Sequence, residues 1–164
     1  MKLLKPRVTD VLKKVGISKD FTGIDPFYAD RGRAVHACIE LYLKGTLDES
    51  SVDEVCRPYF DGFLKFWDKF KFEPFTTELH LENDDYQGTI DLLSDHGIYD
   101  WKCSKSHDRA AEIQGAGYKK LAKSNFPFRV VQFPGDGSYK VFEYKAPIEL
   151  WDCVWKLYQW KIGK

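Results

Sequence analysis

Hydrophobic residues recur along this chain with two different spacings, and the spacing changes near the middle of the sequence. Spacings of three and four residues are typical of helices with one buried face. They predict helices over residues 10–15, 30–44, 51–70, 106–125 and from about 147 to the C-terminus. Start and stop signals accompany them: Thr9, the stretch SVDE, and Ser106 or Asp108 as N-caps, Gly16 and Gly45 as stops, and Pro147 in a first turn. Pro58 is expected to kink or divide the third helix.

Shorter runs rich in β-branched and aromatic residues predict strands. They cover residues 75–83, 86–94, 97–103, 128–133 and 138–144, and the turn PGDG joins the last two. Residues 17–29, with Gly23 and Pro26, are expected to form a loop. The order is helices, three strands, a helix, two strands and a helix. It predicts an α/β fold with a central mixed β-sheet flanked by helices, in a single domain over residues 1–164.

Charge and cysteine usage narrow the functional classes. Twenty-five basic residues balance 25 acidic ones, so a nucleic-acid partner has to be argued from local patches and not from net charge. No apolar run is long enough for a membrane span, and the first residues lack the apolar region of a secretory signal. The four cysteines are scattered without metal-ligand spacing, which predicts reduced thiols in a cytoplasmic protein.

Charged residues interrupt two of the apolar strands. Asp100 and Lys102 are two residues apart and therefore point to one face of their strand, while Trp101 points to the other. A hairpin with His96–Gly97 at its tip would place Asp91 directly opposite Lys102, with Asp100 diagonally beside Asp91. This register predicts that two carboxylates and one ammonium converge.

Two hypotheses explain this convergence. Paired carboxylates suit Mg²⁺ or Mn²⁺, which prefer oxygen ligands and bind phosphate oxygens. Such an ion can activate water and neutralise charge on a phosphodiester, while Lys102 orients the attacking water and stabilises the transition state. The alternative is a purely structural salt bridge between Asp91 and Lys102 across the two strands.

Four stretches occur in an order that resembles the PD-(D/E)XK nuclease superfamily, in its RecB-like exonuclease branch. They are RGRAVH, TTELHL, GTIDLL followed by IYDWKC, and QGAGY. The resemblance covers residues 32 to 118, about half of the chain. It implies a restriction-endonuclease-like αβββαβ core and divalent-metal-dependent cleavage of DNA. Ile90 stands where the family name has proline, as is common in the RecB-like branch.

The resemblance also implies roles for single residues. The implied metal ligands are His36, Asp91, Asp100 and the backbone carbonyl of Trp101, with Asp91 and Asp100 also counted as catalytic. Lys102 matches the catalytic lysine, and Glu78 matches an acid that supports the site directly or through water. Gln114 and Tyr118 match a helix that braces the lysine and contacts the scissile strand; their spacing of four places them on one helical face. Cys153 stands alone near the C-terminus, where related enzymes with an iron–sulfur cluster have several cysteines, so no cluster is expected.

Basic residues near these motifs could form a rim that binds phosphates. They are Arg31, Arg33, Lys105, Arg109, Lys119, Lys120 and Lys123. Lysines on a helix surface often serve solubility alone, so each assignment stays open. The aromatic stripes around Phe66 and Trp151 are expected to be core, with a subunit interface as the alternative for the last helix.

The leading hypothesis is therefore a small DNA nuclease that uses Mg²⁺ or Mn²⁺, an exonuclease acting in recombination, repair or phage replication. A structure-specific endonuclease or nickase stays open, as does a DNA-binding protein that keeps the nuclease fold without turnover. The intact Asp91, Asp100 and Lys102 argue against the latter. The compact size suits a phage protein acting in the host cytoplasm, and a homo-oligomer or a recombination partner protein stays open.

Overall fold

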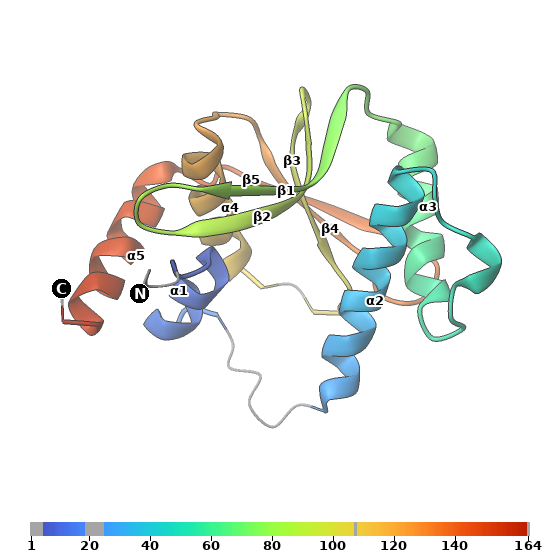
Figure 1. Cartoon of the computed structure of the whole chain (residues 1–164), viewed down its shortest axis with the longest axis horizontal. Helices are drawn as coiled ribbons and strands as arrows, with labels where there is room; N and C mark the ends of the chain where they lie inside the picture. Colours follow the sequence, from blue (N-terminus) through green and yellow to red (C-terminus); the bar gives the residue numbers. More distant parts are fainter. Residues whose placement is uncertain (1–4, 19–24, 107, 164) are drawn as a thin grey trace.

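The computed structural model describes residues 5–18, 25–106 and 108–163. Helices pack on both sides of one five-stranded sheet (Figure 1). The helices are α1 (Val8–Val15), α2 (Pro26–Leu43), the short 3₁₀ helix η1 (Glu49–Ser51), α3 (Arg57–Phe70), α4 (Ala110–Ala122) and α5 (Ile148–Lys161). The strands are β1 (Phe75–Glu82), β2 (Gln87–Ser94), β3 (Gly97–Lys102), β4 (Phe128–Gln132) and β5 (Lys140–Tyr144).

The strands lie in the sheet in their sequence order, β1-β2-β3-β4-β5. Neighbours run antiparallel except β3 and β4, which are parallel and are connected through α4. A parallel pair needs such a long crossover, whereas the antiparallel pairs need only short turns. The predicted mixed α/β fold with an αβββαβ core is confirmed. No helix in the described ranges is both long and apolar enough to cross a membrane.

The starts of α1 and α2 differ from the predictions. Thr9 lies within α1, and Asp10 Oδ2 accepts a hydrogen bond from the Arg7 N–H at that helix start. Helix α2 begins before residue 30, because Asp25 Oδ1 accepts from the Phe27 N–H at 2.9 Å and Pro26 occupies the first turn. Part of the loop predicted for residues 17–29, including Gly23, lies outside the described residues.

The segment before α3 also differs from its prediction. The stretch SVDE does not start an α-helix: its first residue, Ser51, is the last of η1, which Asp48 caps, and α3 starts only at Arg57. Pro58 therefore lies in the first turn of α3, where its missing N–H costs no hydrogen bond, and α3 continues through Phe70 as one helix. The stops at Gly16 and Gly45 agree with the structure, because both glycines have positive φ just after their helices.

The sheet separates two hydrophobic clusters, one under α1, α4 and α5 and one under α2 and α3 (Figure 1). The first cluster comprises Val8, Val11, Leu12, Tyr86, Ile90, Ile98, Ala111, Ala116, Tyr118, Leu121, Phe128, Val130, Ala146, Trp151 and Val154. The second cluster comprises Val35, Ile39, Val52, Cys56, Tyr59, Phe60, Phe63, Phe66, Phe72, Leu92, Tyr99, Trp101, Val131 and Phe133. Burial of Phe66 and Trp151 confirms that both aromatic stripes contribute to the core.

Strand β2 changes face at Asp91. Strand side chains alternate between faces, so Ile90 and Leu92 would ordinarily lie on the same side of the sheet. Instead, Ile90 belongs to the first cluster and Leu92 to the second. The partner strand β1 changes face at the same level, where Glu78 has a φ of +50°. A positive φ is energetically costly for a residue other than glycine. This strained residue lies at the boundary between the two clusters.

Helix α4 lies unusually close to the sheet and to α5. A Cβ atom built on Gly115 would lie 2.3 Å from the Phe128 ring, and one on Gly117 would lie 2.9 Å from the Trp151 ring. Only glycine permits this approach at the two positions. The close packing brings the face of α4 that carries Gln114 and Tyr118 against strands β2 and β3.

Candidate active site

The register of β2 and β3 differs from the predicted one. Ser94 pairs with Gly97, so Asp95 and His96 form the turn, and Lys102 does not lie opposite Asp91. Pairing is recorded only from Ser94–Gly97 to Leu92–Tyr99. One further step would place Asp91 opposite Asp100, but there the two strands separate. Asp91 and Asp100 nevertheless interact, because burial raises the pKa of Asp100 and the Asp91 carboxylate raises it further.

Side chains replace the missing ladder where β2 and β3 separate. The Trp101 N–H donates to Asp91 Oδ2 at 2.7 Å. The Trp101 carbonyl accepts a hydrogen bond from His36 Nε2 at 3.1 Å. Buried backbone groups need partners, and Asp91 and His36 supply them here. The carbonyl that the resemblance assigned to a metal is thus hydrogen-bonded to His36 in this structure.

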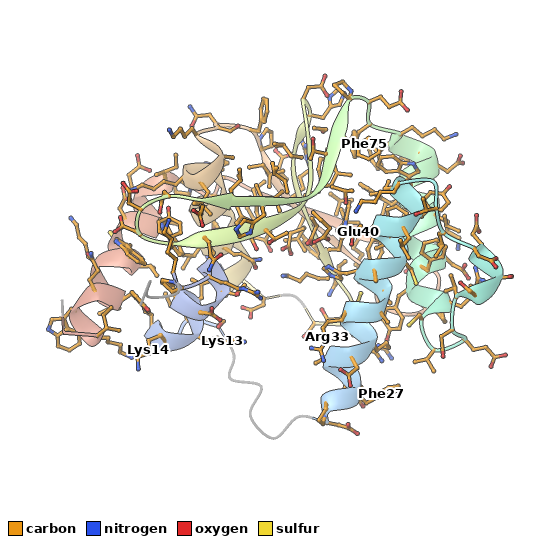
Figure 2. All side chains as sticks on the ribbon, viewed as in Figure 1. Lys13, Lys14, Phe27, Arg33, Glu40 and Phe75 are labelled. Carbon is orange, nitrogen blue, oxygen red and sulfur yellow. The ribbon has the colours of Figure 1, made fainter. Side chains whose placement is uncertain are left out.

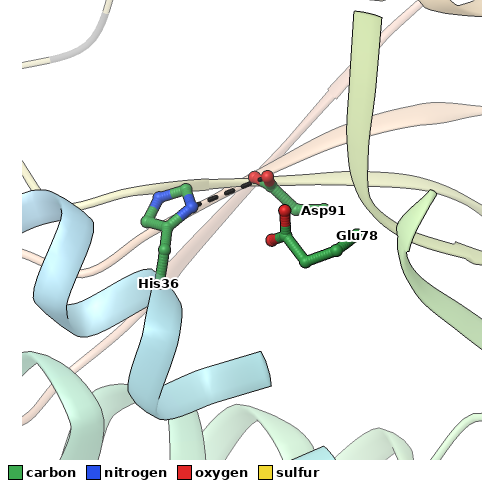
Figure 3. Close-up of side chains that lie close together, drawn as sticks. All are labelled: His36, Glu78 and Asp91. Atoms are coloured by element: carbon green, nitrogen blue, oxygen red, sulfur yellow. Dashed lines mark ion pairs between the residues drawn. The ribbon is translucent and has the colours of Figure 1, made fainter. Parts of the chain in front are cut away.

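His36 from α2, Glu78 from β1 and Asp91 from β2 converge on one point (Figure 3). One ligand atom from each lies within 4.8 Å of the other two, and His36 Nδ1 lies 3.6 Å from Asp91 Oδ1. Because His36 Nε2 faces the Trp101 carbonyl, Nδ1 is the nitrogen directed at the carboxylates. Asp100 lies outside this group of three, and its predicted role as a metal ligand stays a prediction.

Asp100 instead belongs to an adjoining network with Lys102, Gln114 and Tyr118. Lys102 Nζ lies 2.7 Å from Asp100 Oδ2, so the ion pair forms within β3 and not with Asp91 across the strands. Gln114 Nε2 donates to Asp100 Oδ1 at 2.9 Å and lies 3.0 Å from the Tyr118 hydroxyl, while Gln114 Oε1 accepts from Lys102 at 3.3 Å. The helix face predicted to brace the lysine therefore contacts it directly.

Burial and crowding raise the pKa of two of the three acids. Burial raises the pKa of Glu78 to about 7, and the nearby Asp91 carboxylate adds to this shift. Burial also raises the pKa of Asp100, which the Lys102 ammonium only partly offsets. For Asp91, burial is opposed by the facing His36 imidazolium and by the Trp101 N–H, and its pKa lies below the usual range.

The two cationic groups remain charged at neutral pH. Burial alone would lower the pKa of His36, but the Asp91 carboxylate outweighs it and raises the pKa to about 9. Burial likewise opposes the charge on Lys102, whereas Asp100 and then Asp91 raise its pKa above the ordinary range. Without a metal ion, the site therefore balances part of its negative charge with a proton on His36.

The predicted phosphate-binding rim is only partly available. Lys105 and Arg109 are exposed just before α4, and Arg33 is exposed on α2, paired with Asp30. Arg31 is half-buried. Two lysines of α4 are engaged in other contacts: buried Lys119 donates to the Lys145 carbonyl at 2.7 Å, and Lys120 pairs with Asp152 of α5.

One supporting contact escapes any sequence pattern. Thr77 Oγ1 donates to the Asp91 carbonyl at 2.9 Å, which helps to hold β1 and β2 together where their regular alternation fails.

All four cysteines are free thiols, three of them at least half-buried and Cys153 exposed. The network of α4 with β3 could be expected from the spacing of Gln114 and Tyr118, whereas the contact of Thr77 has no signal in the sequence.

No protein-family model matches this chain, and no curated protein resembles it in sequence. Solved structures resemble it in fold. A candidate exonuclease from Eubacterium rectale is 13% identical, with a TM-score of 0.66 over 97% of this chain and 82% of that chain. An alkaline exonuclease from Laribacter hongkongensis is also 13% identical, with a TM-score of 0.54 over 97% of this chain and 86% of that chain. The chain has the fold of these exonucleases. The expected restriction-endonuclease-like fold is thereby confirmed, and the RecB-like branch stays a prediction.

Proposed function

We propose that this chain is a divalent-metal-dependent DNA nuclease that hydrolyses phosphodiester bonds, and that it acts as an exonuclease. The observation that carries the proposal is the convergence of His36, Glu78 and Asp91 beside the Lys102–Asp100 ion pair. The fold shared with exonucleases supports it. One structure of the Laribacter hongkongensis enzyme contains dAMP, which supports a nucleotide substrate for this fold.

The residues present fit a hard divalent cation. The donor set combines carboxylate oxygens with one imidazole nitrogen, a set that Mg²⁺ and Mn²⁺ accept. Asp100 is buried next to this group, and Lys102 Nζ lies 2.7 Å from Asp100 Oδ2 and donates to it. His36, Glu78 and Asp91 would hold the ion, with Asp100 at the margin. When bound, the ion supplies Lewis-acid stabilisation of the phosphate and activation of water.

The chain's own residues divide the remaining work. The Lys102 ammonium, partly exposed at 39% of its side-chain surface, can donate to a phosphate oxygen or to the attacking water. Gln114 holds Lys102 and Asp100 at once, so it fixes the position of the ammonium. Hydrolysis forms one bond from water to phosphorus and breaks the bond from phosphorus to the 3′ oxygen, which takes up a proton. The 5′-phosphate stays on the product.

The decisive experiment uses end-labelled linear DNA and circular single-stranded DNA with Mg²⁺ or Mn²⁺. We expect the linear DNA to be shortened from an end, the circles to be spared, and EDTA to stop the reaction. Asp91→Asn should abolish cleavage while the protein still folds; Asp95→Asn in the exposed turn serves as the matched control. Cleavage of circles would favour an endonuclease or nickase, and activity in excess EDTA would refute the metal mechanism.

We further propose that residues 1–164 form a single domain that works in the cytoplasm, in the host cytoplasm if a phage encodes it. Reduced thiols support this location. A role in recombination, repair or phage replication follows from the proposed exonuclease activity. Sedimentation with and without DNA would test whether the chain acts as a homo-oligomer.

A further inference from the structure

An aromatic stack grows outward from the core at the N-terminal end of α2. Tyr59 of α3 is buried, with 9% of its surface exposed. The Arg31 guanidinium lies over it, 4.4 Å from the ring centroid, and Tyr28 lies on Arg31 at 5.2 Å. Phe27 meets the Tyr28 ring edge to face, with centroids 5.8 Å apart. The stack thus ends in two aromatic rings outside the core.

Both end rings remain largely exposed although they pack on Arg31 and on each other. Phe27 exposes 48% of its surface and Tyr28 exposes 55%. Figure 2 shows Phe27 projecting from the end of α2, away from the sheet. Arg31 Nε is also buried and makes no hydrogen bond with any described residue. A cationic group between aromatic faces, next to exposed rings, suits a ligand that combines flat rings with negative charge.

The same helix connects this stack with the candidate metal group. Tyr28, Gly32 and His36 follow one another at intervals of four and therefore lie along one inclined ridge of α2. A Cβ atom built on Gly32 would meet nothing within 4 Å, so packing does not explain a glycine in this helix interior. Glycine is less favourable there than alanine. An unobstructed ridge between Tyr28 and His36 is what a bound chain would need.

We propose that Tyr28, supported by Arg31 and Phe27, stacks on an unpaired base of a single DNA strand that runs along this ridge toward His36. Eight residues of helix span about 12 Å. A strand stacked as in a duplex, at about 3.4 Å per nucleotide, would cross this distance in about three or four steps, and a more extended single strand would need fewer. A base within a duplex has both faces covered, so the proposal commits to a single-stranded segment. It rests on the proposed nuclease function and names the form of substrate that the site takes.

The test measures binding of fluorescein-labelled single-stranded oligonucleotides by anisotropy in an Asp91→Asn background, which prevents cleavage. Each oligonucleotide carries one abasic position, and the position is moved along the strand. One position, within about four nucleotides of the cleaved bond, should weaken binding about 5- to 150-fold in the parent. Tyr28→Leu, which keeps an apolar side chain but no ring, should weaken binding of the intact strand similarly and abolish the dependence on that position.

Two further variants make the result specific. Tyr28→Phe keeps the ring and should restore the dependence on that position. Trp160→Ala removes an aromatic side chain that is 73% exposed on α5, far along the chain, and should bind like the parent. Equal sensitivity of the parent to every abasic position would overturn the proposal, as would unchanged binding by Tyr28→Leu.

The two proposals fail separately. If the native chain cleaves no DNA with Mg²⁺ or Mn²⁺, the nuclease proposal fails, whatever the abasic profile shows. If the native chain cleaves DNA and the abasic profile of Tyr28→Leu matches that of the parent, only the stacking proposal fails. Melting curves of each variant confirm that a loss of binding reflects the missing ring and not unfolding.

Discussion

Replacing Lys102 by methionine removes the ammonium while keeping most of the side-chain volume. In the structure this ammonium lies 2.7 Å from Asp100, whose side chain is only 5% exposed. Breaking an exposed ion pair costs about 0–1 kcal/mol, whereas breaking a buried one costs about 3–5 kcal/mol. Lys102 is itself partly exposed, and Gln114 still donates to Asp100. We therefore expect the free energy of unfolding to fall by about 1–3 kcal/mol, between these two limits.

Catalysis should suffer more than folding. If Lys102 donates to charge that develops in the transition state, its removal should lower kcat by about 10²- to 10³-fold, as does removal of one oxyanion donor. Lys102→Arg keeps the charge but not the compact ammonium, and should also be impaired. Mn²⁺ binding should survive or tighten, since Lys102 is not among the proposed ligands and its positive charge repels the ion.

A double variant separates the two effects. Asp100→Asn combined with Lys102→Met removes both charges of the pair, so part of the lost stability should return. Cleavage should not return with it. Urea denaturation measures stability, single-turnover digestion of linear DNA well below the melting temperature measures chemistry, and calorimetry measures Mn²⁺ binding. Lys140→Met on the exposed surface of β5 is the control. Cleavage by Lys102→Met at nearly the native rate would refute a catalytic role and leave a structural ion pair.

Three more predictions concern the site and its scaffold. The pKa of His36 is raised from 6.5 to about 9, so the proton on His36 stabilises the metal-free fold fully below pH 6.5. This stabilisation is lost as the pH rises through 9. The urea midpoint of unfolding, measured in EDTA, should therefore fall between pH 6.5 and 9, and it should fall less in His36→Gln. Glu78→Gln should weaken Mn²⁺ binding, measured by calorimetry, by at least about tenfold. Glu40→Gln, one helical turn after His36 on α2, is the control and should leave Mn²⁺ binding unchanged. Gly115→Ala forces a Cβ atom to 2.3 Å from the Phe128 ring and should lower the free energy of unfolding by about 1–3 kcal/mol, measured by thermal unfolding. Gly32→Ala places its Cβ atom in open space and should raise the free energy of unfolding by about 0.5–1 kcal/mol. Equal effects of the two substitutions would contradict the packing described for α4.

The order and type of the elements follow from local patterns, and these were predictable. Each strand began and ended close to its predicted bounds, because alternation and turn residues act over a few positions. The start of α2 was missed although its signal is local as well: Asp25 and Pro26 are a typical cap and first-turn residue. Their position within a stretch rich in turn residues made a loop the simpler interpretation.

The hairpin register was missed by two residues in the partner strand. Both Asp95–His96 and His96–Gly97 are acceptable turn centres, and the sequence does not decide between them. This error alone does not move Asp91 and Asp100 to opposite faces, because a shift of two residues leaves the facing of both strands unchanged. A shift of one would have reversed it.

The place of Glu78 could not be predicted from alternation. A regular β1 strand would orient Glu78 with its neighbours two positions away. The positive φ of Glu78 and the change of face at Asp91 instead depend on how two separate clusters pack against one twisted pair of strands. Tertiary packing of this kind leaves no periodic signal in the sequence.

The change of face at Asp91 also affects how the protein unfolds. Ile90 and Leu92, on either side of Asp91 in one strand, are buried in two different clusters, and His36 reaches Asp91 from a helix that packs on the second cluster. An ion held jointly by His36 and Asp91 would couple the unfolding of the elements around the first cluster to the unfolding of those around the second. In hydrogen exchange in EDTA, we expect the amides around the two clusters to report different opening free energies. In saturating Mn²⁺, both sets of amides should report the same opening free energy.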